Sequence, residues 1–410
     1  MTAAYCCVRV IVRSARTSLF DEIMEQMVRL NNAADSNEYV RQREARVHVI
    51  PMSAPDDMLG MRELRDAGEL DAKKLVAVLA KTEGNGCVND FSRALALRCL
   101  RDEVGADRAD DVAMVMSGGT EGGMSPHMLT FEVLERSRKC TEMSAAETSS
   151  SSSISLAGKK ALALGVAITN PIAPEEIGTE KQIASVEYGV LKAMSMSKIE
   201  SVDDVHFVQV KCPLLTVERI AEAAARGQET RTTDTLKSMG LSRGASALGV
   251  ACGLGELSRD KAREALLSND RSIWSSRAST SAGIELMGHE IIVMGNSSHW
   301  TGSLAIDHDI MKDAIDTKSV KAAIGRLDSL GFNSVKALLA KAEPSASGMI
   351  RGKRHVMLND SDIAGSRHAR ALVGGVLSGL VGRTDIFVSG GAEHQGPDGG
   401  GTIAVIAEHV

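Results

Sequence analysis

The sequence predicts an α/β protein made of three homologous α/β repeats in a pseudo-threefold arrangement around a central active site. The length of 410 residues corresponds to about three domains. Short apolar runs of strand length alternate with segments in which apolar residues recur at helical spacing. A three-part signature also occurs three times: a Lys ends an apolar run, an Arg follows a loop, and a Ser opens a Ser-(Gly/Ala)-Gly-x-Glu turn.

The three copies of the signature keep the same order along the chain. They are Lys81, Arg93 and Ser117; Lys211, Arg243 and Ser281; and Lys341, Arg370 and Ser389. The Lys-to-Ser gaps are 117 − 81 = 36, 281 − 211 = 70 and 389 − 341 = 48, so the intervening loops vary in length. If the repeats close into a ring, these side chains converge on one axis and suit a small, symmetric ligand rich in acceptor atoms. The alternative is that triplication retained a turn geometry without chemistry.

Breaks in composition divide the chain. An unbroken serine run at 149–153 marks one linker, and Gly, Asn and Ser cluster at 296–302. The predicted segments are an N-terminal extension (1–44), repeat A (45–136), a Ser-rich linker (137–157), repeat B (158–297) and repeat C (298–410).

Each repeat mixes strands with helices. In repeat A we expect strands at 47–51, 75–80 and 112–116 and a helix at 90–100. In repeat B we expect strands at 161–168, 205–210 and 291–294, a helix at 216–226, and a helical or buried segment at 246–253. In repeat C we expect strands at 304–306 and 386–388 and helices at 319–327, 334–339 and 369–380. The extension carries a helical pattern at 19–30.

Composition argues against several classes of partner. Aromatic residues are only 3% of the chain and the net charge is −6, which disfavours nucleic acid. No apolar run reaches the length of a membrane span. The seven cysteines are scattered without a C-x-x-C pair, which indicates reduced thiols and a cytoplasmic protein. The alternative is an organellar address, because three Arg precede the first acidic residue, Asp21.

The three lysines lie where a charge is costly, at the ends of predicted buried strands. Lys81 and Lys341 are each followed two positions later by a glutamate, Glu83 and Glu343. Residues i and i+2 share a face of a strand, so these carboxylates could keep both lysines charged.

Lys211 is followed by Cys212 and Pro213 and has no such glutamate. Burial without a carboxylate neighbour predicts that Lys211 has the most depressed pKa. A neutral Lys beside a Ser hydroxyl is a general base with its nucleophile. This difference nominates Lys211 and Ser281 as the reactive pair.

The signature arginines are predicted at helix starts, where their planar guanidinium groups suit carbonyl or anionic oxygens. One competing motif lies beside them: residues 240–244 match the G-x-S-x-G pattern of a nucleophile elbow. A polar segment at 232–237 precedes it in place of the required strand. The ten histidines show no metal-ligand spacing along the chain.

Four segments resemble the cyanuric acid hydrolase/barbiturase family of cyclic amide hydrolases: 81–90, 117–122, 208–215 and 389–397. The resemblance runs from about Val47 to the C-terminus. Segments 242–246 and 367–370 are more similar to the cyanuric acid branch than to the barbiturate branch. The resemblance implies three α/β repeats around one active site, a homotetramer, and a Ser-Lys dyad that opens a triazine ring.

The resemblance also implies roles for residues of this chain. Ser281 and Lys211 would be catalytic, and Lys81 and Lys341 would support them. The substrate-binding positions would be Arg93, Ser117, Gly118, Arg243, Ala282, Arg370, Ser389 and Gly390. A structural Mg²⁺ or Ca²⁺ would be held by Glu343, Ala392, Gln395, Gly396, Pro397 and Gly400, a set of oxygen donors that suits either ion. No organic cofactor is implied.

The implied reaction is hydrolysis of cyanuric acid. Ser281, deprotonated by Lys211, would attack a ring carbonyl, and water would release carboxybiuret, which loses carbon dioxide to give biuret. Two alternatives stay open: a barbiturase acting on barbituric acid, and a catalytically silent threefold ligand-binding protein.

Overall fold

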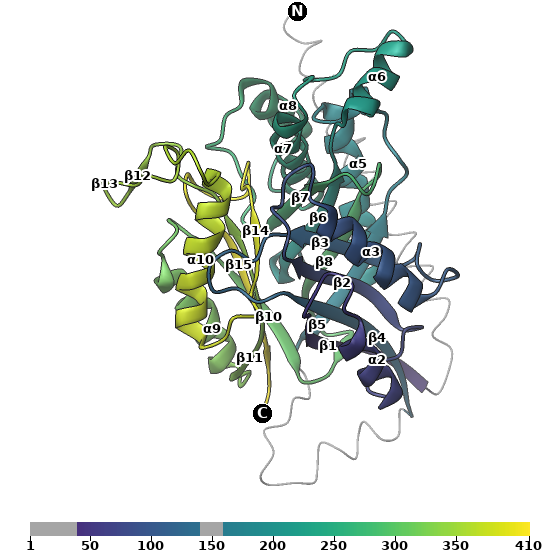
Figure 1. Ribbon diagram of the computed structural model, residues 1–410. Coiled ribbons are helices and arrows are strands. Elements are labelled where there is room, and N and C mark those ends of the chain that lie inside the picture. Colours follow the sequence, from purple (N-terminus) through teal and green to yellow (C-terminus); the bar gives the residue numbers. More distant parts are fainter. Residues whose placement is uncertain (1–38, 140–158) are drawn as a thin grey trace, which may run out of the picture. The chain divides into compact units, whose positions relative to one another are not determined.

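The computed structural model describes residues 39–139 and 159–410. The predicted helix at 19–30 and the serine run at 149–153 therefore lie outside the described residues. Residues 43–134 and 157–410 belong to one compact unit, and the architecture given below is that of its described part. It is a mixed α/β fold with three main sheets (Figure 1).

The three sheets share one strand order. From the edge inwards, the first is β3 (Ala113–Gly118), β2 (Leu75–Thr82), β4 (His127–Lys139), β1 (Tyr39–Pro51) and the short β9 (Trp300–Thr301). The second is β7 (Ala278–Gly283), β6 (Val205–Pro213), β8 (Glu290–Ser297) and β5 (Ala161–Ile168). The third is β14 (Phe387–Gly390), β11 (Ser334–Ala342), β15 (Gly401–Glu408) and β10 (Leu304–Met311). A separate hairpin joins β12 (Met349–Ile350) to β13 (Lys353–Arg354).

Strand direction is also repeated. In each sheet the second strand runs parallel to the edge strand and antiparallel to the third: β2 between β3 and β4, β6 between β7 and β8, and β11 between β14 and β15. The second strands are buried near their C-terminal ends. Their carboxyl ends therefore lie beside those of the edge strands, where polar side chains can meet.

One helix packs against each edge strand: α3 (Phe91–Val104) on β3, α7 (Thr235–Gly253) on β7 and α10 (Gly365–Val381) on β14. Asp90 begins α3 by accepting a hydrogen bond from the Ser92 N–H, as N-cap residues do. The remaining helices are α2 (Leu59–Asp66), α5 (Glu180–Ser197), α6 (Val217–Ala225), α8 (Arg259–Ser268) and α9 (Thr317–Ser329), with short 3₁₀ turns at Pro174–Glu176 and Val202–Asp204.

Most predicted elements are confirmed, with shifted ends. The helix predicted at 334–339 is wrong, because these residues begin strand β11. Lys336, Ala337 and Leu338 are good helix formers, but β11 pairs with strands on both sides, and this long-range pairing overrides local propensity. Strands β4, β7 and β15 and helices α2, α5 and α8 are among the elements for which the sequence pattern gave no prediction.

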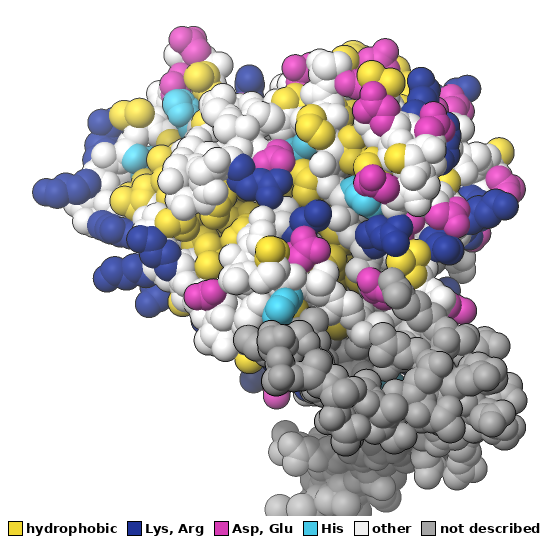
Figure 2. Space-filling view, turned by 90° about the horizontal axis from the view of Figure 1, so that it is seen from below, with side chains coloured by type: hydrophobic (Ala, Val, Ile, Leu, Met, Phe, Trp, Pro, Cys, Tyr) yellow, Lys and Arg dark blue, Asp and Glu magenta, His cyan; other side chains and the backbone are white. Residues whose placement is uncertain are grey.

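The described surface is mixed in charge. Figure 2 shows basic, acidic and hydrophobic side chains interspersed on one face. Within residues 39–139 and 159–410, none of the helices combines the length and apolarity that crossing a membrane requires.

Candidate active site

Each signature lysine lies directly opposite its serine in a parallel strand pair. Lys81 pairs with Ser117, Lys211 with Ser281 and Lys341 with Ser389. Partners in a strand pair place their side chains on the same face of the sheet. The three predicted Lys–Ser pairs are therefore built by the same register in three sheets.

The three lysines are almost completely buried, with relative exposures of 0%, 1% and 1% for Lys81, Lys211 and Lys341. Each Nζ donates to the carbonyl of the residue just before the signature serine of another sheet. Lys81 donates to Val388 O at 2.7 Å, Lys341 to Thr280 O at 2.7 Å, and Lys211 to Met116 O at 2.5 Å. These bonds form a cycle that joins the serine-bearing strands of all three sheets around one point.

Two of the three turn glutamates pair with an arginine from a different sheet's helix. Arg370 makes a two-bond contact with Glu121, with Nε–Oε2 at 2.9 Å and Nη2–Oε1 at 2.5 Å. Arg243 does the same with Glu393, at 2.8 and 2.7 Å. Such fork-to-fork pairs fix the plane of the guanidinium group.

Two of the arginines differ from their predicted place on the helix. Arg93 lies in the first turn of α3, but Arg243 and Arg370 lie inside α7 and α10, not at their starts. The G-x-S-x-G match is likewise interior to α7, and the Ser242 hydroxyl donates to Pro213 O. Ser242 is therefore not on a nucleophile elbow.

The cycle of Arg–Glu pairs is broken at its third position. Threefold repetition would place Glu285 against Arg93, but Glu285 Oε1 lies 2.8 Å from Lys211 Nζ. Arg93 instead donates to the backbone carbonyls of Gly86 and Cys87, and its buried Nε has no hydrogen-bond partner among the described residues.

The serines differ in the same way. Ser117 and Ser389 accept hydrogen bonds from their lysines, at 3.3 Å from Lys81 and 3.1 Å from Lys341. The Ser281 hydroxyl is buried and has no hydrogen-bond partner in the described structure. Ser281 is thus the signature serine whose oxygen is left for another molecule.

The prediction that Lys211 lacks a carboxylate neighbour is wrong. Glu285, four residues beyond Ser281, folds back from the turn and supplies one. Glu83 is exposed, so it does not neutralise buried Lys81. Glu343 pairs with Arg271 at 2.7 Å and accepts from the Ala392 N–H. Glu83 does not share a strand face with Lys81, because β2 ends at Thr82 and the chain turns before Glu83.

Burial lowers the pKa of all three lysines, so the depression is not particular to Lys211. The pKa of Lys81 is well below its usual value, because burial is reinforced by the charge of Arg370. Burial lowers the pKa of Lys341 to about 7. Burial also lowers the pKa of Lys211, while Glu285 opposes the shift. Burial alone would raise the pKa of Glu285, but Lys211 and Arg93 hold it below its usual value.

A cavity of about 380 Å³ lies where the three sheets meet. Its lining includes all the predicted catalytic and substrate-binding residues: Arg93, Ser117, Gly118, Lys211, Arg243, Ser281, Ala282, Arg370, Ser389 and Gly390. Lys81 and Lys341 lie behind it, hydrogen-bonded to the serines. Two glycines at positive φ, Gly119 and Gly391, allow close approach of the arginines, because a Cβ there would lie 2.7 Å from Arg370 and 2.4 Å from Arg243.

Several residues that line the cavity were not predicted from the sequence: Leu236, Lys237, Met239, Gly240, Arg271, Ala364 and Ser366. Those on α7 had a signal, because Leu236 and Gly240 precede Arg243 by seven and three residues. Positions three and seven apart share one face of a helix. The continuity of α7 was not recognised, so this face was not assigned.

The predicted cation ligands lie around one loop. Glu343 contacts Ala392, the Ala392 carbonyl accepts from the Gln395 N–H, and the Pro397 carbonyl accepts from Gly400. The side-chain oxygen of Gln395 accepts a hydrogen bond from the Thr280 N–H. Glu343 thus brings a carboxylate to a loop that offers backbone carbonyls, and oxygen donors of this kind suit a hard cation. Arg271, which pairs with Glu343, would compete with the cation for this carboxylate.

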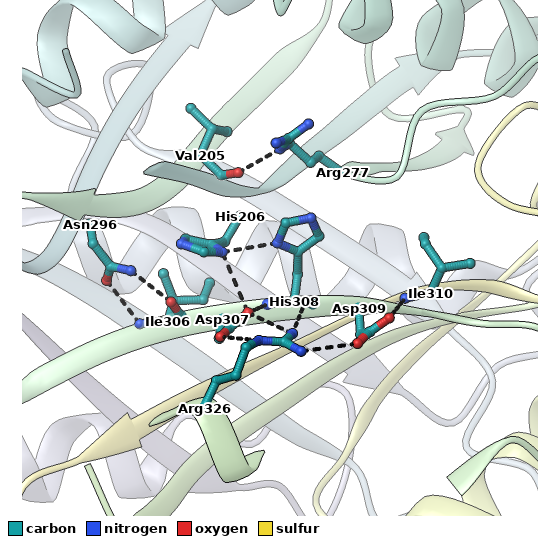
Figure 3. Close-up of polar contacts among 10 residues, drawn as sticks. All are labelled: Val205, His206, Arg277, Asn296, Ile306, Asp307, His308, Asp309, Ile310 and Arg326. Carbon is teal, nitrogen blue, oxygen red and sulfur yellow. Dashed lines mark hydrogen bonds and ion pairs between the residues drawn. The ribbon is translucent and has the colours of Figure 1, made fainter. Parts of the chain in front are cut away.

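A second group of metal-ligand type was not expected from sequence spacing. His206, Asp307 and His308 place one ligand atom each within 4.8 Å of one another (Figure 3). His206 is on β6 and the other two are on β10, so the cluster exists only after these strands pack together. The lack of metal-ligand spacing along the chain therefore did not exclude a group of this type in space.

Comparison with known proteins identifies a family and several relatives that this chain resembles. Residues 46–408 match the amidohydrolase ring-opening protein family. The cyanuric acid amidohydrolase of Azorhizobium caulinodans is 53% identical over 369 residues, covering 88% of this chain and 98% of the relative. The Bradyrhizobium sp. cyanuric acid amidohydrolase is 50% identical over 378 residues, covering 89% and 98%.

Solved structures agree. A crystal structure of cyanuric acid hydrolase from A. caulinodans superposes with a TM-score of 0.81 at 51% identity, covering 90% of this chain and 99% of that one. A structure described as cyanuric acid hydrolase, "evolutionary innovation by structural concatenation", gives 0.80 at 44% identity, covering 90% and 100%. The match extends over nearly the whole described chain, and the protein belongs to the ring-opening amidohydrolase family.

Proposed function

We propose that this protein is a cyanuric acid amidohydrolase, a cyclic amide hydrolase that opens the s-triazine ring. The observation that carries this is the convergence of three Lys–Ser pairs and three arginines on one cavity of about 380 Å³. The names of the relatives give the substrate, and the threefold site explains it. Cyanuric acid is planar and threefold symmetric, with three carbonyls alternating with three ring nitrogens.

Substrate recognition follows from matched symmetry. Arg93, Arg243 and Arg370 would meet the ring carbonyls, since a guanidinium group is a planar donor. Ser117 and Ser389, which accept hydrogen bonds from Lys81 and Lys341, would hydrogen-bond to the rim of the ring. The remaining contacts would come from the backbone at Gly118, Ala282 and Gly390. A buried polar ring must have its groups satisfied, so an analogue lacking one carbonyl should bind much less tightly.

In the reaction, Ser281 is the nucleophile and Lys211 the base. The Ser281 hydroxyl proton passes to Lys211 Nζ as Oγ bonds to a ring carbonyl carbon. The turn N–H groups or a neighbouring serine stabilise the oxyanion. The ring C–N bond then breaks, the leaving nitrogen takes the proton from Lys211, and an acyl-enzyme remains. Water, deprotonated by Lys211, releases carboxybiuret and restores the Ser281 hydroxyl. Carboxybiuret then loses carbon dioxide to give biuret.

Glu285 governs when Lys211 can act as a base. While paired with Glu285, Lys211 is favoured in its charged form. We propose that Glu285 turns to Arg93 once substrate occupies the cavity. That movement completes the third Arg–Glu pair, by analogy with Arg370–Glu121 and Arg243–Glu393, and releases Lys211 beside Ser281. The unpartnered Arg93 Nε supports this exchange.

A Mg²⁺ or Ca²⁺ ion would be held by Glu343 with Ala392, Gln395, Gly396, Pro397 and Gly400. The oxygen-rich loop and the single carboxylate suit a hard cation. Its contribution would be structural: it would tie β11 to the turn that carries Glu393, and so hold Arg243 in place.

The three sheets support three homologous repeats, at 45–136, 158–297 and 298–410, in a pseudo-threefold arrangement. They share strand order, Lys–Ser register and an arginine-bearing helix on the edge strand. We also propose a homotetramer, which the family resemblance supports, and a cytoplasmic location, which the cysteine pattern supports.

The deciding experiment is turnover of cyanuric acid and barbituric acid by purified protein, with Ser281→Ala as the control. We expect cyanuric acid to be hydrolysed with carbon dioxide release and the control to be inactive. Preference for barbituric acid would make the protein a barbiturase. Binding of either ring without turnover would make it a silent binding protein.

A further inference from the structure

We propose that His206, Asp307 and His308 form a second metal site, which takes an imidazole-preferring divalent ion such as Zn²⁺ or Co²⁺. The two imidazoles point their Nδ1 atoms at each other, 2.9 Å apart, and Asp307 Oδ1 lies 3.8 Å from His206 Nδ1 (Figure 3). Two nitrogens and one carboxylate are a common ligand set for zinc. This site is separate from the oxygen-rich loop near the C-terminus.

The two imidazoles already offer a lone pair at this point. An Nδ1–Nδ1 hydrogen bond requires that one of the two nitrogens carries no proton. In the metal-free protein one Nδ1 carries a hydrogen that the other accepts. An ion would replace that shared hydrogen: the donor ring would move its proton to Nε2, and the acceptor ring already carries its proton there.

The spacing is near what an ion needs. Bonds of about 2.0–2.1 Å in a tetrahedral site place two ligand nitrogens roughly 3.3 Å apart. The rings must therefore separate by a few tenths of an ångström. Side-chain exposures of 16% for His206 and 14% for Asp307 leave a route for the ion and for a water as the fourth ligand.

The surroundings hold the carboxylate in place. Arg326 grips Asp307 through Nε–Oδ2 at 2.8 Å and Nη2–Oδ1 at 3.0 Å, and Asp307 Oδ1 also accepts from the His308 N–H. Arg326 and Arg277 oppose a cation here, whereas Asp307 and Asp204 favour it. Hydrogen-bonded carboxylates are usual around metal ligands. These three bonds use three of the roughly four lone-pair sites of the carboxylate.

The position indicates a structural role. His206 lies near the start of β6, five residues from Lys211 at the other end, or about 17 Å along an extended strand. A metal at this point would join β6 of one sheet to β10 of another. Asn296 already ties β8 to β10 through both backbone groups of Ile306, at 2.7 and 3.0 Å. The ion would add a second tie between the same two sheets without touching the catalytic cavity.

The test uses the full chain in excess Mg²⁺ and Ca²⁺, so that the oxygen-rich loop cannot account for the result. Co²⁺ is added, its absorption spectrum is recorded, and metal is counted after desalting. We expect one Co²⁺ per chain, displacement by Zn²⁺ and a higher unfolding temperature with metal. His206→Gln and His308→Gln should each weaken Co²⁺ binding by more than about tenfold and abolish the rise in unfolding temperature.

The matched control is His299→Gln, because His299 pairs with Glu200 on an exposed surface and should leave Co²⁺ binding unchanged. Asp307→Asn checks the carboxylate with little change in size. Turnover measured without added transition metal reports whether each variant has folded. The proposal would be overturned if the wild-type protein kept no Co²⁺ after desalting. It would also be overturned if the His206→Gln/His308→Gln double variant kept as much Co²⁺ as the wild type.

Discussion

Lys211 Nζ lies 2.8 Å from Glu285 Oε1, and this ion pair breaks the threefold pattern of the signature side chains. The other two turn glutamates, Glu121 and Glu393, form ion pairs with arginines. The other two signature lysines donate hydrogen bonds to their serines. The break falls beside Ser281, whose hydroxyl has no partner in the described structure. Under the proposed function, the three Lys–Ser pairs divide into one reactive pair and two substrate-binding pairs.

Glu285→Gln should move the acid limb of the pH profile of kcat/KM to lower pH. The carboxylate raises the pKa of Lys211, so its removal lets Lys211 become neutral at lower pH. Glu121→Gln is the matched control, because Glu121 holds Arg370, and it should raise KM without moving that limb. An unmoved acid limb in Glu285→Gln would refute the role of this pair.

Ser281→Ala should abolish turnover while retaining substrate binding. Ser117→Ala and Ser389→Ala should mainly weaken binding, because each of these hydroxyls is held by its lysine and serves the rim of the ring. Steady-state kinetics of the three variants, with calorimetric binding for Ser281→Ala, separates the roles. Equal losses of kcat in all three with unchanged KM would contradict this division of labour.

Arg243→Lys should lower kcat/KM for cyanuric acid by more than about tenfold, or about 1.4 kcal/mol. A lysine keeps the positive charge but lacks the planar guanidinium group. It therefore cannot make two hydrogen bonds to Glu393 and at the same time donate to the substrate from the same plane. Arg259→Lys, which alters an exposed pair with Glu187, is the control and should leave kinetics unchanged. Parallel loss in both variants would point to general destabilisation.

Lys341→Met should flatten the pH dependence of unfolding between about pH 7 and pH 10.5. Burial lowers the pKa of Lys341 from 10.5 to about 7, so in this window the unfolded chain binds a proton that the folded chain does not. Stability from this group therefore rises with pH, by about 1.4 kcal/mol per pH unit. Urea unfolding at several pH values should show wild type gaining stability relative to Lys341→Met, and a constant difference would disprove the shift.

Removal of residues 1–38 should leave kcat/KM within about tenfold of the full chain. None of the nine signature residues lies there, the family match begins at residue 46, and the cavity is lined from residue 86 onwards. The measurement is kcat/KM for both forms, with assembly checked by light scattering. A larger loss in a folded, correctly assembled truncation would show that the segment reaches the site.

The sequence by itself determined the mixed α/β class of the fold, the three signature copies and the signature residues that line the cavity, but not the other lining residues on α7 or Arg271, Ala364 and Ser366. A signature lysine lies near the end of β2, β6 and β11, and a signature serine near the end of β3, β7 and β14. Parallel pairing of these strands then leaves little freedom in where each lysine meets its serine. Local patterns also sufficed for helices such as α3, with its Asp90 cap.

Tertiary structure alone decided which carboxylate each cation meets. Glu285, Glu121 and Glu393 occupy the same place in their turns, yet one meets a lysine and two meet arginines from another sheet. The helix predicted at 334–339 became a strand for a similar reason, since pairing partners far along the chain outweighed local propensity. His206 and His308 are 102 residues apart, and only the packing of β10 against β6 brings their nitrogens together. Such contacts depend on through-space distance between side chains, which spacing along the chain does not encode.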